Sequence, residues 1–316
     1  MNVDITAQAG NAACTGQTPV TAPYAGFSGT VSQALRPFPQ YQNADVDTVT
    51  MGDPAGVYTY HALQVTAKKR ISAGLTLLAS YAWQKTLTNS DSEYPAVASW
   101  FANGNGGALN TYNLKVEKGL SQYDVPQRLI MSYTYQLPFG KGKQFVNQGK
   151  FAEELVGGWQ FAGVLTYQGG TPLHVTEGGW DSGIFAGNLG ASARPNYVSG
   201  QNMNGYHGGG WVWGQSHRLN AAAFTPAPSY TFGDAPRALK VREFASHGED
   251  LSLSKEIPMY TDKVKALFRL EFFNAFNRAG QYTGFDTNTS DGSNLGSATN
   301  RQNLPRSIQA NLKVLF

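Results

Sequence analysis

Arg306-Ser-Ile-Gln-Ala-Asn-Leu-Lys-Val-Leu-Phe316 is the stretch that decides the fold class. From residue 308 onward one parity of this segment is apolar, formed by Ile308, Ala310, Leu312, Val314 and Phe316. The other parity is polar except for Leu315. Because successive side chains of a strand point to opposite faces, the pattern predicts a strand with one apolar and one polar face. Two structures fit this segment alone: the closing strand of an outer-membrane β-barrel, with lipid against its apolar face, or a core strand of a soluble sandwich.

The composition favours a β-protein with long polar loops over a helical enzyme. Of the 316 residues only 14% are charged, whereas ~25% is usual. Aromatic residues reach 12%, and there are 36 glycines. The net charge of +3 is small and scattered, which argues against a nucleic-acid partner. Cys14 is the single cysteine, so an internal disulfide is excluded, and no apolar run of ~18 residues predicts a transmembrane helix.

The same alternation recurs along most of the chain. Segment 128–137 is the clearest case, with Leu129 and Tyr133 on one parity and Ser132 and Thr134 on the other. The predicted main strands are 58–69, 74–86, 125–137, 158–171, 248–258, 263–277 and 306–316, with 44–51 as a candidate eighth. We therefore expect an all-β, antiparallel transmembrane barrel portion over 58–316, preceded by a loop of extracellular type over 1–57 that holds the candidate edge strand.

The lengths of the connections decide between barrel and sandwich. From residue 58 onward they run short, long, modest, long, short and long. Outer-membrane barrels alternate short periplasmic turns with long extracellular loops, whereas a soluble sandwich has no reason to collect its long loops at one end. Aromatic residues also end several apolar faces, as in the girdles of such barrels, for example Tyr81, Trp83, Tyr135 and Tyr167. The sequence therefore favours the barrel.

This interpretation predicts which side chains meet lipid and which meet the lumen. The lipid-facing set includes Leu77, Tyr133, Phe161, Leu270 and Leu312. The lumen-facing set includes Gln160, Arg269 and Glu271, joined by Arg128 and Lys313. Lumen charges of this kind can contact a ligand or a plug, or they can be only solvated or paired.

Several short motifs resemble the C-terminal barrel of Oar-like TonB-dependent receptors, the receptors with a carboxypeptidase-regulatory-like domain. They follow one another in order from about residue 30 to the end, and their order and spacing make the resemblance specific. The motifs are Tyr60-His-Ala-Leu-Gln-Val65, Ser80-Tyr-Ala-Trp-Gln-Lys85, Tyr135-Gln-Leu-Pro-Phe-Gly-Lys-Gly-Lys143, Tyr167-Gln-Gly-Gly-Thr-Pro172, Asp250-Leu-Ser-Leu-Ser-Lys255 and Arg269-Leu-Glu-Phe-Phe-Asn-Ala-Phe-Asn277.

The resemblance implies a 22-stranded receptor of the Gram-negative outer membrane, plugged by an N-terminal domain and driven by the TonB complex. Such receptors import bulky ligands, here of the oligosaccharide or peptide class. This sequence shows 7–8 of the strands and no signal peptide, TonB box or plug, so we expect a C-terminal part that does not transport by itself. Ile308, Ala310, Leu312, Val314 and Phe316 resemble the signal read by the barrel-assembly machinery.

No catalytic, cofactor or metal motif is found. The five histidines have no ligand spacing, and Asp286, Asn288 and Ser290 fail the calcium-loop pattern at its sixth and twelfth positions. Trp180, Trp211 and Trp213 lie in the longest loop, where they could stack on a sugar, grip a peptide or pack the loop against itself. The alternatives to a receptor are a small self-contained outer-membrane porin or enzyme, and a soluble carbohydrate-binding β-domain.

Overall fold

The computed structural model describes a subset of the chain, and the account below concerns these residues. They are 21–27, 34, 39–40, 56–70, 74–89, 91, 109–110, 113–140, 143–146, 155–177, 193–228, 231–259, 264–278, 282–301 and 303–316. The candidate strand at 44–51 lies outside them. No helix among the described residues is long and apolar enough to cross a membrane.

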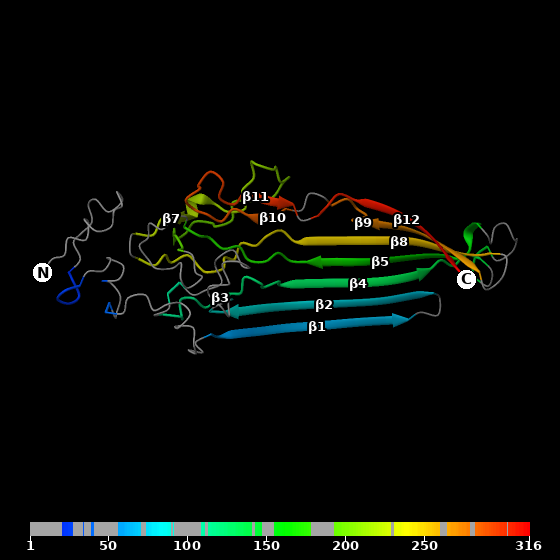
Figure 1. The fold of residues 1–316 in the computed structure, drawn as a ribbon, viewed down its shortest axis with the longest axis horizontal. Helices are drawn as coiled ribbons and strands as arrows, with labels where there is room; N and C mark the ends of the chain where they lie inside the picture. Colours follow the sequence, from blue (N-terminus) through cyan, green and yellow to red (C-terminus); the bar gives the residue numbers. More distant parts are fainter. Residues whose placement is uncertain are drawn as a thin grey trace.

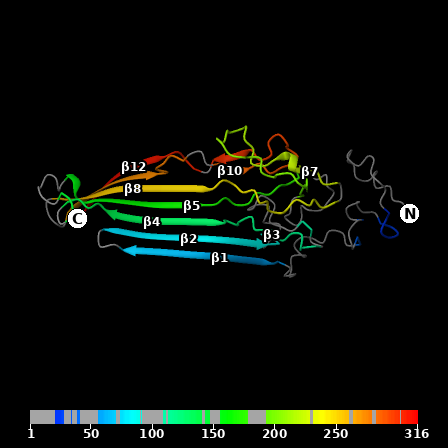
Figure 2. The same ribbon diagram turned by 180° about the vertical axis from the view of Figure 1, so that it is seen from behind.

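Seven long strands form one antiparallel sheet in which each strand pairs with the next long strand along the chain. In Figures 1 and 2 these strands lie side by side as a single curved layer. They are β1 (Tyr58–Arg70), β2 (Leu75–Thr88), β4 (Gln127–Gln136), β5 (Trp159–Gln168), β8 (Ser246–Pro258), β9 (Lys265–Phe273) and β12 (Ser307–Leu315). All seven predicted main strands are confirmed. β1 and β12 form the two edges, so the sheet is open.

The register gathers apolar side chains on one face of the sheet, called here the apolar face. Reading across the strands, one row is Leu77, Tyr133, Gly163, Leu251, Phe272 and Ile308. The next row, on the opposite or polar face, is Thr76, Thr134, Ala162, Ser252, Glu271 and Gln309. Because the side-chain period of a strand is two, this register keeps the predicted lipid-facing and lumen-facing sets on opposite faces in the strands that carry them, β2, β4, β5, β9 and β12.

Among the described residues, no second layer of protein covers the middle of the apolar face. Ile308 is 60% exposed and Leu312 67% exposed, although both are large and apolar. The hydrophobic core lies instead in the long connections, where buried residues cluster around Val175, Leu219 and Leu239. Exposed apolar area of this extent marks a surface that meets another apolar phase.

The short and long connections lie at opposite ends of the strands. Figure 1 shows the end of β1 and the start of β2 at the end where the C-terminus lies, and the described parts of the long connections at the other end. We call the described residues of the three long connections, 89–126, 169–245 and 274–306, the cap. The cap contains β3 (Gly119–Leu120), β6 (Asn196–Tyr197), η5 (Ala221–Ala223), β7 (Phe224–Thr225), β10 (Tyr282–Phe285) and β11 (Ala298–Arg301).

The structure corrects two details of the sequence prediction. β9 ends at Phe273, whereas the prediction continued it to 277. Asn274 and Asn277 have positive φ angles of 49° and 53°, which Asn tolerates better than most residues and a strand does not allow. The segment 278–305 is also more than a polar loop, because β10 and β11 pair there as a hairpin.

Candidate functional site

Buried arginines join the parts of the cap. Arg237, in the connection before β8, forms an ion pair with Asp91, in the connection after β2, and each side chain is only 3% exposed. Arg237 Nη2 also donates to the Thr88 carbonyl at 2.8 Å and to the Leu120 carbonyl at 3.2 Å. One side chain therefore ties the longest connection to the end of β2 and to β3.

A second buried pair lies beside the first. Arg194 Nη2 donates to Glu117 Oε1 at 2.7 Å, and the Glu117 carboxylate is completely buried. Glu117 Oε1 also accepts a hydrogen bond from the Asn110 backbone N–H at 3.0 Å. Burial lowers the pKa of the Arg194 guanidinium, and the Glu117 charge opposes that shift. Since buried charges persist only when they are paired, Glu117 and Arg194 fix each other's position.

The third pair connects the cap to the sheet. Arg242 Nη2 donates to Asp124 Oδ2 at 2.5 Å, and the Thr86 backbone N–H of β2 donates to Asp124 Oδ1 at 2.6 Å. Arg242 Nη1 donates to the Asp124 and Gly170 carbonyls at 2.7 and 3.1 Å. Asp124 therefore links β2 directly to the segment that leads into β8.

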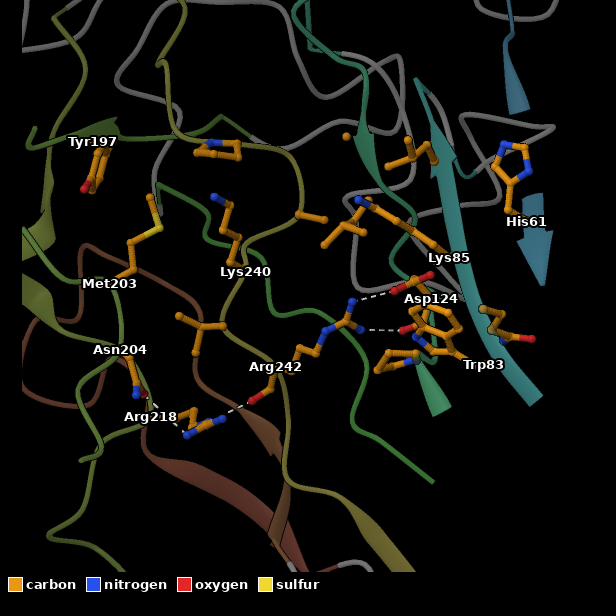
Figure 3. A pocket seen from close by; sticks show the side chains of 18 of the residues that line it. His61, Trp83, Lys85, Asp124, Tyr197, Met203, Asn204, Arg218, Lys240 and Arg242 are labelled. Atoms are coloured by element: carbon orange, nitrogen blue, oxygen red, sulfur yellow. Dashed lines mark hydrogen bonds and ion pairs between the residues drawn. The ribbon is translucent and has the colours of Figure 1, made fainter. Parts of the chain in front are cut away.

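A cavity of about 1440 Å³ opens where the cap meets the cap-side ends of β1 and β2. The sheet contributes His61, Leu63, Trp83 and Lys85 to its lining. The cap contributes Arg218, Lys240 and Arg242 among others. Figure 3 shows Trp83 and Lys85 extending from β2 toward Asp124 and Arg242, with Lys240 and Arg218 on the cap side. The volume exceeds the ~300–1,000 Å³ of typical small-molecule sites, so a bulky ligand fits.

Arg218 is fixed in the cavity wall by neutral partners. Its Nε donates to the Arg242 carbonyl at 2.7 Å and its Nη1 to Asn204 Oδ1 at 3.4 Å. The guanidinium carbon also lies 4.8 Å from the centre of the Phe244 ring. Burial lowers the pKa of Arg218, but an arginine of this kind stays charged. Among the described residues no carboxylate forms an ion pair with it, so the wall keeps a fixed positive charge.

The predicted ligand-binding residues do not gather in this cavity. Trp211 packs edge-on against Tyr206, Phe244 and Phe285, with ring centres 5.1–5.7 Å apart. This placement matches the alternative in which the loop packs against itself. Trp213 is 45% exposed and lies beside Tyr282 and Arg301. Trp180 lies outside the described residues.

Arg269 and Glu271 lie on the polar face of β9, in the half of the strand nearer the cap, and neither lines the cavity. Arg269 Nη1 and Glu271 Oε1 are 3.5 Å apart, and both side chains are partly exposed. Their register neighbours are polar: Asn311 faces Arg269, and Ser252 faces Glu271. The binding role given to these two residues and to the tryptophans therefore stays a prediction.

The described residues that could suggest metal or acid–base chemistry include the turn around Asp286 and the side chain of His174. No group of three or more His, Cys, Asp or Glu side chains among them could hold a metal ion. Asp286 and Asn288 instead accept hydrogen bonds from backbone N–H groups two residues ahead, which stabilises turns. Burial lowers the pKa of His174 to about 4, so this side chain is neutral near pH 7.

Sequence reasoning did not single out the cavity residues Lys85, Arg218, Lys240, Asp124 and Arg242. Lys85 carried a usable signal, because it follows Trp83 on the same parity of β2 and breaks an apolar row. The cap residues carried none, since their partners are remote in sequence; Arg242 and Asp124 are 118 positions apart.

Comparison with known proteins gives three findings. A family model for an outer membrane beta barrel domain matches residues 5–309. No curated protein matches the chain. The solved structure of FpvA from P. aeruginosa, bound to heterologous pyoverdines, is similar at 12% sequence identity with a TM-score of 0.37. That match covers 82% of this chain and 19% of the FpvA chain, so the chain spans about a fifth of FpvA.

Proposed function

The chain belongs to the outer membrane beta barrel domain family, and from this premise we propose that it forms part of an Oar-like TonB-dependent receptor for a bulky ligand. Its place is the outer membrane, and its apolar face is the surface that meets lipid. One observation carries the proposal: a seven-stranded meander with one apolar and one polar face carries a large folded cap at one end.

The open edges of the sheet support a larger barrel. β1 and β12 do not pair with each other. An unpaired strand edge cannot face lipid, because its backbone N–H and C=O groups find no partners there. Further strands are therefore needed between these two edges. In the receptor we propose, they come from the part of the barrel that precedes this portion, and a plug fills the wider lumen.

The cap supports ligand capture from outside the cell. Its buried ion pairs tie the long connections to one another, and one of them, Arg242–Asp124, also lies in the cavity wall. The ligand class we propose is an oligosaccharide or peptide, with Trp213 available at the cap surface and Arg269 and Glu271 in the lumen. The partners are outer-membrane lipid, the barrel-assembly machinery and, through the plug, the TonB complex.

Energised uptake separates this function from that of a porin. A strain lacking the gene should lose uptake of fluorescent oligosaccharides or peptides of its ligand class, and deletion of tonB should cause the same loss. A porin passes its solutes without TonB, so uptake that survives tonB deletion would favour the porin. An outer-membrane enzyme would instead give product from the labelled compound on tonB-deficient cells.

Deletion of Phe316 tests the assembly signal. Phe316 is fully exposed at the end of the chain, on the parity of the apolar row of β12. We expect the deletion to lower the amount of receptor in the outer membrane several-fold, as measured by immunoblot of membrane fractions. Replacing Leu315 by Ser is the matched control, since Leu315 lies on the polar parity and should change the level little. An unchanged level after Phe316 deletion would identify β12 as an ordinary strand.

A further inference from the structure

The cavity is built on two successive rungs of the β1–β2 pair. Leu63 faces Trp83 in one rung, and His61 faces Lys85 in the next rung toward the cap. Residues two positions apart on a strand share a face, so Lys85 lies on the same apolar face as Trp83. All four residues line the cavity. An apolar rung is thus followed immediately by a basic one.

The height of these rungs matches the outer boundary of the membrane. A transmembrane strand needs about 9–11 residues to cross. β2 begins at Leu75 next to the short turn, so Trp83 is its ninth residue and Lys85 its eleventh. Trp83 therefore lies at the level of an interfacial aromatic girdle, and Lys85 lies at the level of lipid head groups.

The cap adds further positive charge above the same place. Lys240 and Arg218 line the cavity from the cap side (Figure 3). Among the described residues, Lys85, Lys240 and Arg218 form no ion pair, and the lining carboxylate of Asp124 is already bonded to Arg242. The cavity therefore presents positive charge toward whatever occupies it.

We propose that this cavity holds a phosphate-bearing lipid of the outer leaflet. Lys85 contacts the phosphate, Lys240 and Arg218 add positive charge from the cap side, and an acyl chain lies along Leu63 and Trp83. A soluble anion would leave these two side chains, 55% and 58% exposed, without an apolar partner. Basic clusters beside apolar membrane surface recognise anionic head groups in this way. The inference rests on the membrane-facing assignment made under the proposed function.

Quenching by brominated lipids tests the site. The complete receptor would be reconstituted in phosphatidylcholine vesicles containing brominated phosphatidic acid or, separately, brominated phosphatidylcholine. The Trp83 contribution is taken as the fluorescence lost in Trp83→Phe. We expect the Trp83 signal to be quenched preferentially by phosphatidic acid, by at least about fivefold at equal mole fraction, since each basic residue near the surface adds about that factor.

The matched variants separate head-group recognition from general membrane contact. Lys85→Gln with Lys240→Gln should abolish the preference, whereas Lys69→Gln, on the same face at the other end of β1, should preserve it. Heat-modifiable migration on gels confirms that each variant is folded. Equal quenching by both lipids in the native receptor would overturn the proposal.

Two further arms distinguish the source of the phosphate and the proposed function. Inorganic phosphate at millimolar concentration should not relieve quenching; relief of quenching would assign the cavity to a soluble anion and overturn the lipid. The assay requires membrane insertion but no TonB. If uptake proved independent of TonB, the lipid-binding inference would therefore still stand. If Trp83 fluorescence did not depend on the lipid, only the lipid-binding inference would be contradicted.

Discussion

Leu270→Arg is expected to remove most of the folded receptor from the outer membrane, while Glu271→Gln leaves the level near normal. Leu270 lies on the apolar face between Leu253 and Ala310 in neighbouring strands. An arginine at a lipid-facing mid-membrane position costs about 2–4 kcal/mol. Glu271 lies on the polar face beside Ser252 and Gln309, where an amide keeps hydrogen-bonding capacity.

The two changes are adjacent in sequence, so local strand propensity and chain position are matched between them. The measurement is the heat-modifiable fraction of receptor in purified outer membranes, normalised to total synthesis. Equal loss from both variants would contradict the assignment of Leu270 to the lipid-facing side. Greater loss from Glu271→Gln would indicate that the polar face, and not the apolar face, meets lipid.

Arg237→Met is expected to open the cap without unfolding the sheet. The substitution removes the ion pair to Asp91 and the hydrogen bonds to the Thr88 and Leu120 carbonyls. Breaking a buried pair by removing one partner typically costs about 3–5 kcal/mol, because the remaining charge stays buried. Hydrogen exchange of the backbone amides of Leu173 and Leu239, which bond to carbonyls within the cap, should accelerate strongly.

Lys265→Met provides the control for Arg237→Met. Lys265 pairs with Glu256 at 2.5 Å, but these side chains are 45% and 51% exposed and lie at the end of the sheet opposite the cap. Exposed pairs of this kind contribute about 0–1 kcal/mol. Cap amides should therefore exchange at the native rate in Lys265→Met. Native exchange in Arg237→Met would show that the Arg237–Asp91 pair does not hold the cap.

The sheet could be predicted from the sequence because its determinants are local. A strand that meets lipid on one face and polar groups on the other has apolar and polar residues in alternation, as in 307–315. Short turns such as the one ending at Gly74, with φ of 88°, also have local signals. Strand ends were less certain, since β9 stops where Asn274 leaves the extended conformation.

The cap could not be predicted, because its determinants are distant pairs. The Arg237–Asp91 pair joins positions 146 apart, and neither residue carries a pattern in its own neighbourhood. Trp211 illustrates the same difficulty. Its sequence context suited either a ligand or a packing partner; the positions of Phe244 and Phe285 show that the ring packs against the cap, and its ligand contact stays a prediction.

The cap packs against protein and the sheet faces lipid, so the two parts should tolerate different substitutions over evolutionary time. On the apolar face, Leu312 and Ile308 are exposed to fluid lipid, so another large aliphatic residue should replace either one at little cost. In the cap, Leu239 packs against, and Arg237 donates hydrogen bonds to, residues of segments that are remote in the sequence. Substitutions there should occur as compensating pairs. Between related chains, strand residues should vary independently of one another, whereas cap residues in contact should vary together.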